Sequence, residues 1–319
     1  MVKLNLQLKK SYDEDQLIFY AGGVIEGIAV ELNGIIKCQN TMGLPVTHQI
    51  FQKRKEFLSQ NLVKLAVGQY NYPFSIEIPY RLPQTNKKVK CKDFQHIRYN
   101  ITAVFQPKNR TAEKVKQKFI LKRCDYSNFY PALREPIEKE CKKRFFGFCS
   151  VSDKVSIPYA GIAAGEIIPI KIIINNKSDV EITQTKIQLL ESEVFYTRSY
   201  EWGNREDLLV ESIEVGVKPN EYKEIIHELK VPEDVYMSDL LYAEECYLMH
   251  SIKVIANVKG LHYKMEVFIP IVLGKERFEG NFDDEQKINE EDSAVLVNFL
   301  AKKKFYYKLK PWCYSWTVC

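Results

Sequence analysis

Long apolar runs are absent from this sequence. Residues 1–16, MVKLNLQLKKSYDEDQ, contain no apolar stretch as long as a signal peptide requires, and no later window approaches the ~18 apolar residues of a membrane-spanning helix. Long segments with the 3.6-residue period of an amphipathic helix are also missing from the first 275 residues, which argues against an α/β fold. We therefore expect a cytoplasmic protein that is built mainly from strands.

Motifs of catalysis and metal binding are missing as well. The sequence has no G-x-S-x-G, no H-E-x-x-H and no glycine-rich phosphate loop, and its five histidines stand apart from one another. Its eight cysteines form no C-x-x-C pair, which is typical of reduced thiols. We expect no enzyme, no metal and no cofactor. An enzyme on a β scaffold stays open as an alternative, and it would require His250, His262 and a carboxylate within ligand distance.

What the sequence does contain is a repeated strand pattern. Residues 23–33 (GVIEGIAVELN) and 165–175 (GEIIPIKIIIN) begin with glycine, end with asparagine and alternate apolar residues between, 142 positions apart. Two other pairs of segments, 74–79 with 227–232 and 99–105 with 252–258, are 153 positions apart. We interpret these pairs as two homologous domains and expect a single core strand over residues 23–33.

The predicted fold class is all-β, with two tandem immunoglobulin-like β-sandwich domains. A chain of 319 residues suffices for about two domains. We place the domains at residues 1–125 and 141–275, with an aperiodic linker at 126–140 and a flexible tail at 276–319. The segment 34–58 predicts a loop with one irregular hairpin. Strands of the second domain are expected near 144–157, 166–175, 181–197, 208–217, 222–231, 247–258 and 262–273.

Charge is divided unevenly along the chain. Residues 1–125 hold 21 Lys and Arg against 10 Asp and Glu, whereas residues 126–275 hold 18 against 23. A cationic first domain favours an anionic partner. The candidate phosphate or cargo ligands are basic residues of three segments that would meet if their strands end together; scattered surface charges are the alternative. These residues are Lys9, Lys10, Lys53, Arg54, Lys55, Lys87 and Lys88. Nucleic acid is not expected, because the aromatic residues lie within strand patterns rather than among the basic ones.

The tail changes character along its length. Residues 279–292 carry seven acidic residues and one lysine, and an apolar, basic and aromatic stretch follows. Ser293 could cap a short helix that inserts Val295 and Leu296 into a membrane surface, with Lys302, Lys303 and Lys304 on acidic head groups. The alternative is a solvated acidic linker with a loosely docked end.

Several stretches resemble strand motifs of the arrestin family, most closely its arrestin-domain-containing (α-arrestin-like) members. They are YAGGVIEGIAVEL, VGQYNYPFSIEIPYRLP, IRYNITAVF, FYPALREP and AAGEIIPIKIIINNKS. The resemblance covers about residues 2–275. It implies the same two-sandwich fold, and a role for Lys9 and Lys10 in binding phosphates on receptors.

The resemblance also implies a function. Members of the family are non-catalytic adaptors that bind cytoplasmic tails of membrane receptors or transporters and direct their ubiquitination, endocytosis and endosomal sorting. We therefore expect recruitment from the cytoplasm to the plasma membrane or endosomes. The alternative is a constitutive coat subunit similar to the arrestin-fold subunit of retromer. Pro311 is the only proline after residue 275, so the tail has no Pro-Pro-x-Tyr motif for docking a ubiquitin ligase.

Overall fold

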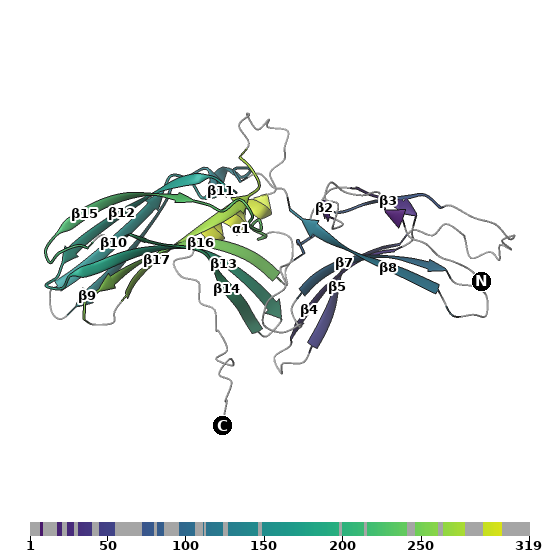
Figure 1. The fold of residues 1–319 in the computed structure, drawn as a ribbon, viewed down its shortest axis with the longest axis horizontal. Coiled ribbons are helices and arrows are strands. Elements are labelled where there is room, and N and C mark those ends of the chain that lie inside the picture. The colour runs from purple at the N-terminus through teal and green to yellow at the C-terminus, as the bar shows by residue number, and fades with distance from the viewer. Residues whose placement is uncertain are drawn as a thin grey trace, which may run out of the picture. The chain divides into compact units, whose positions relative to one another are not determined.

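The structure is a computed structural model, and it divides the chain into two compact units (Figure 1). Unit 1 comprises Met1–Arg123 with Thr197–Tyr200, and unit 2 comprises Cys124–Tyr196 with Glu201–Cys319. The structure describes residues 7–8, 18–20, 24–28, 31–39, 45–54, 72–79, 82–85, 96–105, 111, 113–123, 127–145, 149–197, 200–213, 216–240, 246–260, 264–277 and 290–301.

The described strands of unit 1 form two sheets. Its strands are β1 (Gln7–Leu8), β2 (Ile18–Tyr20), β3 (Val24–Ile28), β4 (Glu31–Gln39), β5 (Pro45–Arg54), β6 (Phe74–Glu77), β7 (His96–Phe105) and β8 (Glu113–Lys122). A three-stranded sheet has the order β1-β3-β6, and a five-stranded sheet has the order β2-β8-β7-β4-β5. Alternation along β6 buries Phe74 and Ile76, while β7 buries Ile97, Tyr99 and Ile101. These side chains form an apolar core of the kind that a sandwich requires.

The prediction of one strand over residues 23–33 is wrong. β3 ends at Ile28 and β4 begins at Glu31, and the two strands belong to different sheets. A period-two pattern reports that one face of a strand is buried, but it does not report to which sheet the strand belongs. The irregular hairpin expected in residues 34–58 is confirmed as β4–β5, which has a register shift between Gly34 and Ile35.

The described strands of unit 2 likewise form two sheets (Figure 1). Its strands are β9 (Ile137–Phe145), β10 (Cys149–Ile157), β11 (Gly161–Ala163), β12 (Ile167–Lys177), β13 (Ile182–Thr197), β14 (Tyr200–Ile213), β15 (Tyr222–Lys230), β16 (Cys246–Val258) and β17 (Lys264–Gly274). The orders are β15-β12-β10-β9 and β11-β17-β16-β13-β14. Ile168, Ile170, Ile172 and Ile174 of β12 are all fully buried, as the alternation of the sequence predicts.

Two parts of unit 2 lie where the sequence shows no periodicity. The stretch 126–140, expected to be a linker, holds the 3-10 turn η1 (Pro131–Leu133) and the first residues of β9. In the tail, α1 (Glu290–Ala301) buries Leu296 and Phe299 in the core of unit 2 and contacts β17 and η1. Ser293 lies inside this helix and is not its cap. Because Leu296 is only 1% exposed, the prediction that it inserts into a membrane is wrong.

Gly165 and Glu166 immediately precede β12, and they fix the conformation of the loop before it. Gly165 has a φ of +78°, a conformation that glycine adopts without strain. Glu166 accepts hydrogen bonds from the Tyr159 hydroxyl (2.6 Å) and the Ala163 amide (2.6 Å), and its carboxylate lies 3.4 Å from Arg277. Burial, followed by the hydrogen bond to Glu166, raises the pKa of Tyr159. This cluster joins the start of β12 to the residues that follow β17.

The buried side-chain amide of Asn176 forms hydrogen bonds at the other end of β12. Its Nδ2 donates to the carbonyls of Val180 (2.8 Å) and Lys218 (3.0 Å), and its Oδ1 accepts from the amide (3.2 Å) and hydroxyl (2.6 Å) of Ser178. The N-N-K-S motif is therefore a local hydrogen-bonding device in which Asn176 holds together two turns of unit 2.

Replacing Asn176 with alanine should lower the free energy of unfolding by about 2–3 kcal/mol, because the substitution removes the hydrogen bonds of a buried side chain, including the acceptor of the Ser178 amide. Urea denaturation measures this change. The neighbouring Asn175 is only half-buried, so Asn175→Ala serves as a matched control that should cost less than about 1 kcal/mol. Equal losses in the two variants would contradict the role given to Asn176.

Candidate functional site

Most of the predicted phosphate ligands lie outside the described residues. These are Lys9, Lys10, Lys55, Lys87 and Lys88, together with the predicted membrane contacts Lys302, Lys303 and Lys304. Lys53 and Arg54 are the last two residues of β5, and the side chain of Lys53 is exposed. The proposed convergence of the basic segments therefore stays a prediction.

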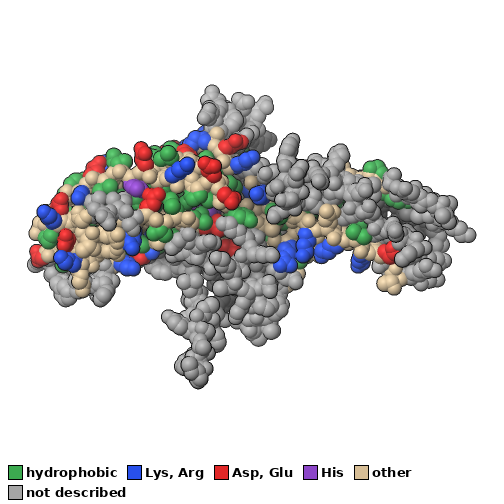
Figure 2. Space-filling model, in the orientation of Figure 1, with side chains coloured by type: hydrophobic (Ala, Val, Ile, Leu, Met, Phe, Trp, Pro, Cys, Tyr) green, Lys and Arg blue, Asp and Glu red, His purple; other side chains and the backbone are tan. Residues whose placement is uncertain are grey.

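The described cationic surface of unit 1 lies instead on β8. Four lysines at alternate or near-alternate positions are exposed, while Phe119 and Leu121 point to the core. We call Lys114, Lys116, Lys118 and Lys122 the lysine row. Figure 2 shows Lys and Arg side chains gathered over this part of unit 1. The sequence signal for the row is the period-two spacing of K-V-K-Q-K, which a search for basic loops overlooks.

The neighbouring strand β7 supplies polar groups beside the lysine row. Lys118 is the register partner of Asn100, and Lys116 that of Thr102. The Thr102 hydroxyl donates to Asn100 Oδ1 at 3.1 Å, and both side chains are buried although they lie on the face opposite to the apolar core. Arg98, two residues before Asn100, adds a half-buried guanidinium to this face.

The charges of this surface are not neutralised within the described part of unit 1. The structure places neither the lysine row nor Arg98 in an ion pair with another described residue. Lysine ammonium groups bind phosphate and carboxylate oxygens as compact charges with three donors each. The arrangement can therefore bind an extended chain that carries several negative charges.

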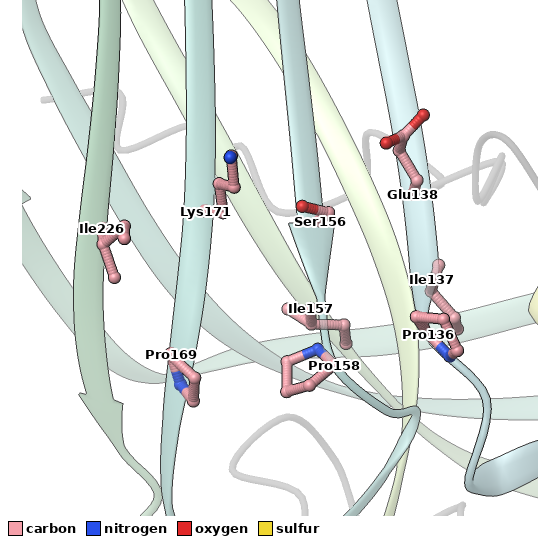
Figure 3. Close-up of a pocket in the computed structure, with 9 residues that line it drawn as sticks. All are labelled: Pro136, Ile137, Glu138, Ser156, Ile157, Pro158, Pro169, Lys171 and Ile226. Atoms are coloured by element: carbon pink, nitrogen blue, oxygen red, sulfur yellow. The ribbon is translucent and has the colours of Figure 1, made fainter.

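A second surface is a groove on the outer face of the four-stranded sheet of unit 2, with a volume of about 470 Å³ (Figure 3). Glu138, Ser156, Lys171 and Ile226 are successive register partners across β9, β10, β12 and β15. A parallel row is formed by Pro136 just before β9, Pro158 just after β10 and Pro169 in β12. We call this surface the proline groove.

Charges on the rim of the proline groove are paired, and its floor is apolar. Lys154 lies 2.8 Å from Glu138, and Lys171 lies 2.7 Å from Glu224. The hydrogen bond to Glu224 raises the pKa of Lys171. Ile226 is 67% exposed and Ile167, on the same face, is 54% exposed. Side chains of this type exposed together on a sheet face indicate an interaction surface.

The histidines do not form a metal centre in the described residues. His250 is buried between the Ser238 hydroxyl, 2.9 Å from its Nδ1, and Glu191, whose carboxylate lies 3.5 Å from its Nε2. His262 lies outside the described residues, and His227 contacts Glu211 at the surface. Nowhere in the described ranges do three or more His, Cys, Asp or Glu side chains lie close enough to hold a metal ion.

No helix in the described part of the chain has the length and apolar character that crossing a membrane requires.

Comparison with known families identifies the second unit. The family model described as "Arrestin (or S-antigen), C-terminal domain" matches residues 150–278, which span β10 to β17. A comparison with curated proteins finds no match. The match contains the G-E and N-N-x-S motifs that begin and end β12, and the sheets of unit 2 are those of an all-β sandwich. Unit 2 therefore belongs to the family of arrestin C-terminal domains.

Proposed function

We propose that this protein is a non-catalytic cytoplasmic adaptor that binds acidic or phosphorylated tails of membrane proteins through unit 1. It directs them to endocytosis, ubiquitination or endosomal sorting at the plasma membrane or endosomes. The match of residues 150–278 to the arrestin C-terminal domain supports the general role, an arrestin-type trafficking or signalling adaptor. The observation that supports binding of acidic or phosphorylated tails is the lysine row, whose charges have no ion-pair partner in the described residues.

The proposal assigns the lysine row and Lys9–Lys10 to the same ligand. An extended peptide rises about 3.3 Å per residue, and alternate lysines of β8 have a spacing twice as large. A peptide that lies along the strand therefore presents every second side chain to a new lysine. Charge-assisted hydrogen bonds of this kind are stronger than neutral ones, and salt screens them when they are exposed.

Charge reversal in the lysine row tests the proposal. Lys116→Glu/Lys118→Glu should weaken binding of a multiply phosphorylated receptor-tail peptide by at least about tenfold, since each charge-assisted contact contributes more than 1 kcal/mol. Fluorescence anisotropy measures the dissociation constant, and the affinity should fall as salt is raised.

Two exposed lysines of unit 2 provide the matched control. Lys177→Glu/Lys218→Glu changes the net charge equally and should leave peptide binding unchanged. Lys9→Glu/Lys10→Glu should weaken binding if those residues share the ligand. Equal affinity for phosphorylated and plain peptides, unaffected by any of these variants, would refute phosphate recognition. A stable stoichiometric partner that co-purifies from cells would favour the coat-subunit alternative instead.

A further inference from the structure

We propose that the proline groove of unit 2 is the docking site of the chain's own carboxyl-terminal segment, residues 302–319. The groove presents an exposed isoleucine and three proline rings on the outer face of a sheet. Apolar surface of this kind is favourable to cover, and its volume of about 470 Å³ lies within the ~300–1,000 Å³ of ligand pockets.

The last turn of α1 lies beside β9, the strand that forms one wall of the groove. The ammonium of Lys139 donates a hydrogen bond to the carbonyl of Leu300 at 2.8 Å, which fixes the last turn of the helix beside β9. The next residue before Lys139 in β9 is Glu138, which lines the groove. The helix therefore ends beside the strand that forms one wall of the groove.

The segment is long enough to reach the floor of the groove. Successive residues of a strand point to opposite faces, so Lys139 and Glu138 lie on the two sides of β9. β9 is an edge strand of its sheet. A chain leaving Leu300 needs only to turn around this edge, and eighteen residues span up to about 60 Å when extended. Sheet layers are only ~10 Å apart, so the length is ample.

The composition of the segment matches the groove. Six of its residues are aromatic: Phe305, Tyr306, Tyr307, Trp312, Tyr314 and Trp316. Aromatic rings bury large areas against flat apolar surfaces such as proline rings, while a tyrosine hydroxyl or indole N–H keeps a polar partner. The Ser156 hydroxyl lies between the apolar walls and can serve as such a partner.

One unpaired carboxylate on this face can bind a lysine of the segment. The segment contains five lysines, three of them directly after α1. Glu228 of β15 is exposed and has no ion pair with another described residue. The other carboxylates of this face, Glu138, Glu140 and Glu224, pair with Lys154, Lys142 and Lys171.

Photo-crosslinking in the full-length chain tests the proposal. A benzophenone amino acid in place of Ile226 should crosslink within the same chain to residues 302–319, with a yield independent of protein concentration. The same group in place of Val210, an exposed residue of β14, should give no such product. Mass spectrometry of the digested product locates the crosslink. A crosslink to a second copy that disappears on dilution, or none above the Val210 control, would overturn the proposal.

Limited proteolysis gives a second measurement. Ile226→Asp should increase the initial rate of tryptic cleavage after Lys308 by roughly tenfold, because burial of an aliphatic side chain contributes at least a factor of ten to a docking equilibrium. Val210→Asp should leave the rate unchanged. Both residues are exposed, so neither change removes a side chain from the core. Identical cleavage rates in the two variants would show that the segment does not occupy the groove.

Discussion

Asp153→Asn should stabilise unit 2 at pH 8 by roughly 2–4 kcal/mol. Asp153 lies on the core face of β10 between Val151 and Val155, and its side chain is fully buried. Neither carboxylate oxygen has a hydrogen-bond partner among the described residues. Burial raises the pKa of this carboxyl to about 7. An uncompensated charge in the core is therefore removed when asparagine takes its place.

The direction of the pH dependence follows from the raised pKa. An aspartate in the unfolded chain has a pKa of about 3.9, so between pH 4 and 7 the folded state holds a proton that the unfolded state has lost. Stability from Asp153 is fully present below pH ~4 and falls by about 1.4 kcal/mol per pH unit until pH ~7. Above that range its contribution no longer changes.

Urea unfolding of the wild type and of Asp153→Asn at pH 5, 6, 7 and 8 measures this dependence. The difference between the two proteins should grow with pH and level off near neutrality. Asp234 is exposed, so Asp234→Asn is a control that should follow the wild type at every pH. A constant difference between the wild type and Asp153→Asn would contradict the raised pKa.

Gly161→Ala should destabilise unit 2 by about 3 kcal/mol or more. A Cβ at this position would lie 1.8 Å from the carbonyl oxygen of Ser127 and 3.0 Å from Leu133 Cβ. The backbone carbonyl cannot rotate away as a side chain can. The segment of Ser127 would therefore move, and with it the hydrogen bond of 2.9 Å from its amide to the carbonyl of Glu276.

Thermal or urea unfolding of Gly161→Ala provides the measurement, and Gly216→Ala is its control. A Cβ at Gly216 would meet its nearest neighbour at 3.4 Å, an ordinary contact, so that variant should change stability by less than about 1 kcal/mol. If Gly161→Ala were as stable as Gly216→Ala, the close approach of the Ser127 backbone would not hold in solution.

Prediction from sequence succeeds where the apolar period is uninterrupted. The strands expected at 166–175, 181–197, 222–231, 247–258 and 262–273 are confirmed within a few residues by β12, β13, β15, β16 and β17. β9 is missed because its sequence, IEKECKKRF, is mostly charged and follows a proline. Its pairing with β10 over nine residues gives this stretch its strand conformation, a tertiary effect that local propensity does not report.

The candidate sites are harder to predict than the strands. Basic loops are visible in the sequence as clusters of Lys and Arg. The lysine row is spread over nine positions of one strand, and its lysines form one surface only because alternate residues of a strand share a face. The proline groove unites residues from four strands, of which Pro136 and Ile226 are ninety positions apart. The burial of Asp153 does have a signal in the sequence, since Asp153 occupies a position where the alternation of β10 calls for an apolar residue.

The docking of α1 also bears on where a fragment of this protein can end. The family match stops at residue 278, but Leu296 and Phe299 belong to the core that begins at Tyr130. A fragment cut at 278 would keep every described strand of unit 2 and still lose two buried side chains and the hydrogen bond from Lys139 to Leu300. The segment that matches the arrestin C-terminal domain is thus shorter than the compact unit that contains it.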